Sequence, residues 1–250
     1  MSDPTKPAAA DSEQGDAASW AKPITHLTAT DLQPDPRRIN NVDGRLATNP
    51  LQGFGRMWRK RHQVRMADID VDPNAVIATW KADFGSFWPR GNKFYGPITG
   101  LAPGEVALID VVIPGKQRLS TGVLVLYADH ESFSLMTPQG HVFAGWITFS
   151  SYREEGVTVA QVDILMRASD PFYEIGMELM GHRQENTFWE QTLANVATRF
   201  GSTALATTEV ELIDPRRQWK YARNVFQNSA IRTGFKRTTA PFRHRRPNQA

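Results

Sequence analysis

Three side chains with the chemistry of metal ligands recur at four-residue intervals late in the chain. Glu174, Glu178 and His182 would stack on one face of an unbroken helix, and Glu185 follows them. Carboxylate oxygens and an imidazole nitrogen are ligands that divalent metals accept. A dinuclear carboxylate site, however, needs a Glu-x-x-His pair on each of two helices, and no such pair occurs. Gly181 is also expected to end the helix before His182, which favours solvated or capping roles.

Polar residues also interrupt two apolar, strand-like runs. In the run 157–168, Gln161, Asp163 and Arg167 are separated by even numbers of residues, so they share one strand face, and Asp110 interrupts an earlier run. On a concave face these groups would be buried and would need to pair with one another or with a ligand. On a convex face they would form an ordinary solvent-facing surface. The sequence leaves both alternatives open.

The motifs of several well-marked enzyme classes are missing from the sequence. It contains no G-x-S-x-G nucleophile elbow, no P-loop and no G-x-G-x-x-G dinucleotide fingerprint. None of the 6 histidines pairs with another at metal-ligand spacing, and the chain has no cysteine, which excludes disulfides and thiolate metal sites. We therefore expect no metal and no cofactor, and the sequence leaves open whether the protein is an enzyme.

The composition indicates a folded protein with a large aromatic content. The chain has 250 residues, 40% of them hydrophobic, with 13 Phe and 7 Trp that could fill a core or surround a pocket. No window approaches the roughly 18 apolar residues of a membrane-spanning helix. The N-terminus lacks the basic and apolar regions of a secretory signal. We therefore expect a soluble, cytoplasmic protein; the oligomeric state is not predicted.

The net charge of +3 hides an uneven distribution. Residues 214–250 contain ten Arg or Lys and one acid, a net charge of +9, which leaves −6 for residues 1–213. Aromatic residues are interleaved with these basic residues, so the extension could bind nucleic acid or an anionic membrane surface. Alternatively, the segment from Trp219 to Phe226 packs back on the domain and the final arginines are solvated, which is the favoured interpretation. The acidic remainder argues against a nucleic-acid-binding domain.

Strand patterns dominate the middle of the chain. Residues 1–50 lack apolar periodicity and predict an arm that is disordered or loosely wrapped, whereas residues 54–213 show the pattern of a folded domain. A helix is expected to begin at Asp72-Pro73. Turn signals separate the remaining predicted elements, which indicates an antiparallel sheet. The predicted strands are residues 58–66, 105–113, 119–127, 132–136, 141–152, 157–168 and 207–213.

The first predicted strand carries a dense basic cluster: Arg56, Arg59, Lys60, Arg61 and Arg65. Alternation places Arg59, Arg61 and Arg65 on the side opposite Trp58 and Val64. The cluster could bind phosphate, but a solvated outer face of a half-buried strand is the favoured interpretation.

Helix patterns follow the last long strand. Asp170-Pro171 is a second helix start, and apolar residues on two sides of residues 171–180 predict a helix that is buried between layers. Gly181 is expected to end this helix. A separate helix is then predicted up to Phe200, because one apolar face runs through Trp189, Leu193, Val196 and Phe200.

The order of a first strand, a helix, an antiparallel meander and a long C-terminal helix resembles the helix-grip fold of the START/Bet v 1-like (SRPBCC, polyketide cyclase and lipid-transport) superfamily. The resemblance covers residues 56–200 and rests on the first strand with Asp72-Pro73 after it, on the run HVFAGWITF and on the run FWEQTLANVATRF. It implies an α+β fold in which a curved antiparallel sheet grips the C-terminal helix. It also implies an apolar cavity between the sheet and that helix. The extra helix 171–180 and the basic extension depart from this pattern.

The sequence therefore predicts a protein that binds a hydrophobic or aromatic small molecule in an internal cavity. The predicted ligand-binding residues are Tyr127, Trp146 and Phe149 from the sheet, Phe172, Met177 and Trp189 from the helices, and Asp163 and Arg167 as polar contacts. One alternative is a cyclase or dehydratase that uses Asp163 or Glu178 as general acid or base. The other is an interaction protein that acts through its basic extension.

Overall fold

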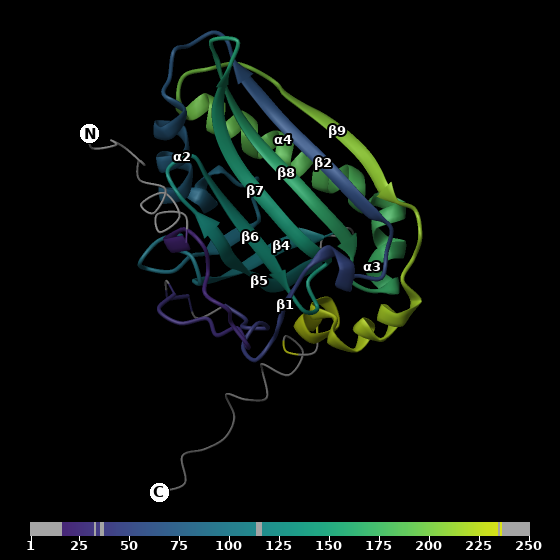
Figure 1. Cartoon of the computed structure of the whole chain (residues 1–250). Helices are drawn as coiled ribbons and strands as arrows, with labels where there is room; N and C mark the ends of the chain where they lie inside the picture. Colours follow the sequence, from purple (N-terminus) through teal and green to yellow (C-terminus); the bar gives the residue numbers. More distant parts are fainter. Residues whose placement is uncertain (1–16, 33, 36–37, 114–116, 235, 237–250) are drawn as a thin grey trace, which may run out of the picture.

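A computed structural model describes residues 17–32, 34–35, 38–113, 117–234 and 236 of the chain (Figure 1). The beginning of the predicted arm, the predicted turn at Pro114-Gly115 and the end of the basic extension lie outside the described residues.

Within the described residues, nine strands form one antiparallel sheet in the order β3-β4-β5-β6-β7-β8-β2-β9, and β1 pairs with β6 (Figure 1). The meander from β4 to β8 follows the sequence, and β2 and β9 extend the sheet beyond β8. The predicted helix-grip sheet is thus confirmed, with two further short strands. The strands are β1 (Ala47–Thr48), β2 (Met57–Met66), β3 (Lys93–Tyr95), β4 (Val106–Ile113), β5 (Gln117–Ala128), β6 (Ser132–Pro138), β7 (Phe143–Glu154), β8 (Val157–Ala168) and β9 (Ala206–Asp214).

Two helical regions cover the concave face of the sheet. The first is α2 (Pro73–Ala82), which begins where the sequence predicts it, because the Asp72 side chain accepts a hydrogen bond from the Asn74 amide. Trp80 of α2 is fully buried against the stacked rings of Phe133 and Phe149. A short 3-10 turn, η2 (Phe84–Phe87), adds further aromatic side chains to this core.

The second region is one continuous helix of three parts: α3 (Pro171–Gly176), the π-helical turn η4 (Met177–Gly181) and α4 (His182–Arg199). The predicted break at Gly181 is wrong, since this residue has right-handed helical angles of φ −65° and ψ −40°. A Cβ atom on Gly181 would lie 2.5 Å from Met177 Sδ, so the Met177 side chain would have to shift to admit one. The glycine therefore allows close packing inside the helix, and no separate helix is inserted before the last one.

The convex face of the sheet is covered only in part. Alternate residues of β4 face opposite sides: Ala107 and Ile109 belong to the main core, whereas Val106 and Leu108 belong to a second cluster. The segment from residue 17 to 48 supplies the other side of this second cluster, mainly with Leu27, Leu32 and Val42. This segment is thus packed more closely on the sheet than its composition predicts.

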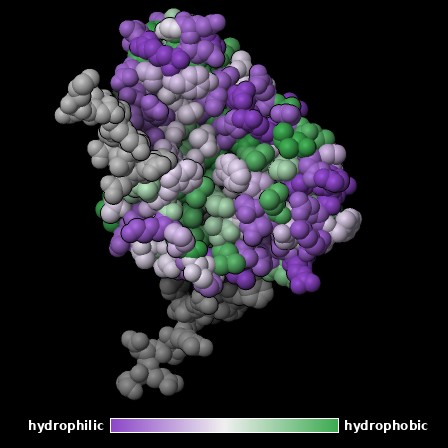
Figure 2. Space-filling view, viewed as in Figure 1, coloured by the Kyte–Doolittle hydropathy of each residue, from purple (hydrophilic) through white to green (hydrophobic). Residues whose placement is uncertain are grey.

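The remaining convex face, over β2, β8 and β9, carries polar and charged side chains. Arg59 and Arg61 of the basic cluster form ion pairs with Asp163, and Arg65 pairs with Glu154. The interpretation of these arginines as a polar outer face is therefore favoured over a phosphate-binding patch. From this side, hydrophilic residues cover much of the surface around hydrophobic groups (Figure 2).

The beginning of the C-terminal extension packs along one edge of the domain as the 3-10 helix η5 (Trp219–Gln227) and a short helix over residues 229–234. The Asn224 side chain donates hydrogen bonds to the carbonyls of Gln52 and Ser169. Gly140 has a φ of 82°, and any side chain there would collide with the backbone of Gln227, so this turn must be a glycine. None of the helices in these described ranges is long and apolar enough to cross a membrane.

Candidate functional site

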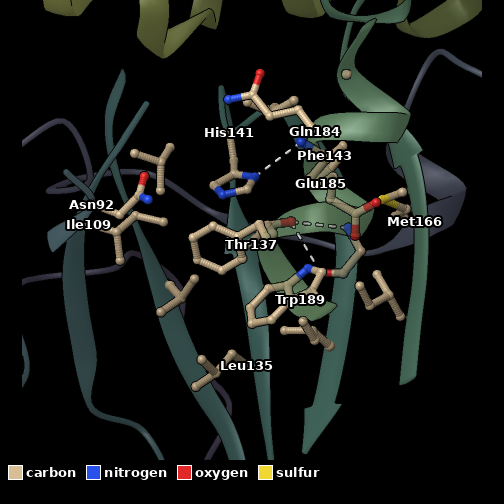
Figure 3. A pocket seen from close by; sticks show the side chains of 18 of the residues that line it. Asn92, Ile109, Leu135, Thr137, His141, Phe143, Met166, Gln184, Glu185 and Trp189 are labelled. Atoms are coloured by element: carbon tan, nitrogen blue, oxygen red, sulfur yellow. Dashed lines mark hydrogen bonds between the residues drawn. The ribbon is translucent and has the colours of Figure 1, made fainter. Parts of the chain in front are cut away.

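A cavity of about 190 Å³ lies between the concave face of the sheet and the helix η4–α4 (Figure 3). Its walls are overwhelmingly apolar. The sheet contributes Ile109, Leu135, Ile147 and Phe149, and the helix contributes Met177, Phe188 and Trp189. Engineered cavities of about 150 Å³ with such walls hold one benzene molecule. The space therefore suits an apolar molecule of one or two rings.

The walls follow from strand alternation and helix periodicity. Ile147 and Phe149 of β7 pair across the ladder with Leu135 and Phe133 of β6, so their side chains share the concave face. On α4, the inward stripe that includes Leu193 continues back through Trp189 to Glu185, since residues four apart lie on one helix face. One polar residue thus stands at the end of an apolar stripe.

Several polar side chains in the wall have hydrogen-bond partners. Thr137 Oγ1 exchanges hydrogen bonds with the backbone of Gly145 at 3.0 and 3.1 Å. Asn92 Oδ1 accepts from the Val112 amide at 2.8 Å, and Gln184 Nε2 donates to the Val112 carbonyl at 2.7 Å. These groups support the walls with their own hydrogen bonds.

His141 also lines the cavity. Its Nδ1 accepts a hydrogen bond from the Phe143 amide at 3.1 Å, which places the proton of the neutral ring on Nε2. Burial lowers the pKa of His141 to about 4, so the ring is neutral at pH 7.

The most unusual polar group in the wall is a buried ion pair. Lys60 points inward from β2 and is fully buried. Its Nζ donates to Glu185 Oε2, to Asn186 Oδ1 at 2.7 Å and to the His182 carbonyl at 3.3 Å. These three bonds account for all three protons of the ammonium group.

Glu185 is satisfied on one oxygen only. Its side chain is 10% exposed, Oε2 accepts from Lys60, and Oε1 has no hydrogen-bond partner among the described residues. Burial raises the pKa of Glu185, while Lys60 and the nearby Trp189 indole oppose that shift; the indole does not, however, complete a hydrogen bond to Oε1. A buried polar atom without a partner costs roughly 1–3 kcal/mol, and more when it is charged. Glu185 and Trp189 project from the helix into the space bordered by His141, Ile109 and Leu135 (Figure 3).

The structure brings four of the predicted ligand-binding residues to this cavity: Trp146, Phe149, Met177 and Trp189. Trp146 borders the space, but its ladder partners are Met136 and Leu165, which alternate with the inward-facing Leu135 and Ile164. Strand alternation therefore directs the Trp146 side chain to the opposite face.

The other four predicted residues lie elsewhere. Asp163 is on the convex face, where its carboxylate pairs with Arg59 at 2.8 Å. Tyr127 donates a hydrogen bond to Asp129 and packs on the ring of Trp20. Phe172 is 59% exposed on the outside of α3.

Arg167 is buried, but on the convex side. It donates to the carbonyls of Gly55 and Arg216 at 2.6 and 2.8 Å and forms an ion pair with Asp214 at 2.6 Å. Arg167 thus attaches the beginning of the extension to the sheet. Of the two alternatives for the polar residues of β8, the convex face is the one observed.

The carboxylates at four-residue spacing do not converge on a metal. The buried Glu174 and the exposed Glu178 both form ion pairs with Arg56 and Arg217, whereas Glu185 pairs with Lys60. No group of three or more metal-ligating side chains occurs in the described part of the chain.

Sequence reasoning missed Lys60 and His141 and considered Glu185 only as a metal ligand. Lys60 was grouped with the outward-facing arginines, although it alternates with them and shares its parity with Trp58 and Val64. Glu185 precedes Trp189 by four residues, so extension of the apolar stripe by one turn would have placed it in the wall. His141 carries no periodic signal, because it lies in the turn before β7.

No family model matches the sequence, and no curated protein matches it. Among solved structures, the chain is similar to a START superfamily protein from Mycobacterium smegmatis, with 18% identity, a TM-score of 0.41, and coverage of 58% of this chain and 99% of that chain. It is also similar to the di-domain ARO/CYC StfQ from the steffimycin biosynthetic pathway (10% identity, TM-score 0.43, 58% of this chain and 53% of that one). A third is Ara h 8.0201 (11% identity, TM-score 0.37, 57% and 99%). The helix-grip fold itself is established by the sheet order and the helix described above.

Proposed function

We propose that the protein binds a small apolar or aromatic molecule in the cavity between its sheet and its C-terminal helix. The observation that supports this most directly is the cavity itself: about 190 Å³ of space with apolar walls and few polar groups. Sites for small molecules are mostly apolar, with a few polar groups that fix orientation. Well-packed cores leave few voids larger than a water molecule, so a space of this size is unusual in a purely structural core.

The volume limits the size of the ligand. Pockets for drug-sized molecules typically enclose about 300–1,000 Å³, which is more than this cavity offers. One aromatic ring or two fused rings would fill the space, whereas a long acyl chain or a tetracyclic molecule would require the helix to move.

The alternative of a cyclase or dehydratase has weaker support. Asp163, one of the two predicted acid–base residues, lies on the face of the sheet away from the cavity, and Glu178 pairs with Arg56 and Arg217 outside the helix. The alternative of an interaction through the basic extension stays a prediction, since most of that segment's terminal arginines lie outside the described residues.

The proposal is tested by native mass spectrometry of the purified protein, followed by calorimetric titration with naphthalene. We expect either a discrete co-purified mass or saturable, one-to-one binding of naphthalene by the empty protein. A matched pair of variants on neighbouring residues of β7 locates the site. Ile147→Trp fills the cavity and should abolish binding, whereas Thr148→Val alters the opposite face and should retain it.

Melting temperatures of both variants control for loss of folding. The proposal is contradicted if wild type binds neither a co-purified molecule nor naphthalene, or if the folded Ile147→Trp protein binds as tightly as wild type.

A further inference from the structure

Two hydrogen-bonding atoms of the cavity wall have no partner among the described residues: the indole Nε1 of Trp88, which is a donor, and Glu185 Oε1, which is an acceptor. Thr137, Asn92 and Gln184 each have partners within the protein. Glu185 Oε1 has none among the described residues, although its side chain is nine-tenths buried and lines the cavity. Buried polar atoms are nearly always paired, so an exception at a binding surface points to a partner that the folded chain does not itself contain.

The ion pair also determines which kind of partner fits. The three protons of Lys60 are engaged by Glu185, Asn186 and the His182 carbonyl. Lys60 therefore has no donor left for a ligand. The pair offers the cavity a carboxylate oxygen, which accepts hydrogen bonds, so a ligand must supply the donor.

The charges in the cavity wall limit the chemical class of the ligand further. Lys60 already neutralises Glu185, and the rest of the wall is mostly apolar and carries no other charged side chain among the lining residues. A cationic amine would bring an uncompensated charge into this environment, and a carboxylate would be repelled by Glu185. A neutral hydroxyl or N–H group meets neither penalty.

We propose that the ligand is a neutral aromatic molecule of one or two rings that carries a hydroxyl or N–H group, such as a phenol, a naphthol or an indole, and that this group donates a hydrogen bond to Glu185 Oε1. This inference rests on the proposed function and adds to it a polar recognition residue and a ligand class. The rings occupy the apolar space beside Trp189 and Phe149, and the donor points toward Glu185 on α4.

The test compares three probes that share the same rings: 2-naphthol, which has a donor; 2-methoxynaphthalene, whose oxygen cannot donate; and naphthalene. Calorimetric titration at pH 7 gives the dissociation constant of each. A hydrogen bond to a charged acceptor corresponds to about 10-fold or more in affinity. We therefore expect wild type to bind 2-naphthol about 10-fold or more tightly than either of the other probes.

The matched variant is Lys60→Met/Glu185→Leu, which replaces the ion pair by apolar side chains of similar size and so avoids an isolated buried charge. This variant should bind naphthalene at least as well as wild type and should lose the preference for 2-naphthol. The Thr148→Val protein, altered on the opposite face, should keep that preference.

The outcomes separate the two proposals. If wild type binds all three probes with equal affinity, the role of Glu185 is overturned while the proposed function stands. The same holds if the double variant keeps the preference for 2-naphthol. If wild type binds none of the probes and carries no co-purified molecule, the proposed function fails and the inference fails with it.

Discussion

Two buried ion pairs lie on opposite faces of the same sheet, and they differ in how completely they are satisfied. On the convex side, Arg167 has carbonyl and carboxylate partners, and both oxygens of Asp214 accept hydrogen bonds from Arg167 and Arg216. On the concave side, Lys60 is saturated, but one oxygen of Glu185, a residue of the cavity wall, has no partner among the described residues. The first pair joins two parts of the chain, whereas the second leaves a position for another molecule.

The pKa directions show the same contrast. Hydrogen bonds from Arg216 and Arg167 lower the pKa of Asp214, and burial raises the pKa of Glu185 despite its lysine partner. The two carboxylates thus differ in burial as well as in the number of hydrogen bonds that they accept.

Removal of one member of the inner pair should have the largest effect. Lys60→Met leaves Glu185 buried without its cation, and such a change typically costs about 3–5 kcal/mol. We expect urea unfolding at pH 7 to show a loss of this size, and the double change Lys60→Met/Glu185→Leu to recover most of it. A double variant as unstable as the single one would mean that Lys60 contributes mainly through its packing.

Arg167→Met should have a smaller and more local effect. The change leaves the carbonyls of Gly55 and Arg216 without this donor, at a cost of about 2–3 kcal/mol. Hydrogen exchange should accelerate in residues 214–234, while naphthalene binding stays unchanged in the folded protein. A loss of naphthalene binding would show that the two faces are coupled, contrary to the separation argued above.

As the pH falls, protonation of histidines on the cavity side should reduce folding stability at a higher pH than protonation of Asp214 does. Burial lowers the pKa of His141 and of His182 to about 4 in the folded protein, below the usual value near 6.5. The unfolded chain therefore takes up protons first, and stability falls as the pH drops from about 6.5 to about 4. The lowered pKa of Asp214 acts in the same direction but at lower pH: its contribution to stability is complete above its ordinary value of 3.8 and is lost only below it.

Replacement of His141 by Gln measures how much this histidine contributes to the pH dependence of stability. The free energy of unfolding should depend less steeply on pH between 6.5 and 4, by about 1 kcal/mol per pH unit. Urea titrations at several pH values give the slope, and His130→Gln, which alters an exposed histidine, is the matched control. An unchanged slope in the His141 variant would mean that this ring is protonated in the folded state.

Much of the fold is predictable because it depends on local patterns. Strand β8 has the boundaries that its alternation predicts, and Asp72 and Asp170 both cap the helices that follow them. These features need only neighbouring residues, since alternation and capping act over a few positions. The wrapped segment around Leu27 and Val42 was missed because its buried residues contact distant strands and follow no period.

The candidate site was only partly predictable, for a different reason. Phe149, Met177 and Trp189 are large and apolar, so composition and spacing indicate them. Lys60 and Glu185 are charged residues that the sequence alone suggests should face solvent, and their burial depends on each other across β2 and α4. No local sequence pattern predicts a pairing between residues so far apart in the chain. The alternation of β2 does, however, place Lys60 on the inner side of the sheet.

The π-helical turn at Met177–Gly181 has a consequence for how the chain can change in length. A π turn closes its hydrogen bonds over one residue more than an α turn, so the helix holds the equivalent of a single inserted residue at this point. Loss of one residue here could restore an ordinary α-helix, and the two ends would keep their separate surroundings: Pro171–Gly176 near the extension and His182–Arg199 on the sheet. We therefore expect this helix to tolerate the deletion of one residue better at this position than elsewhere.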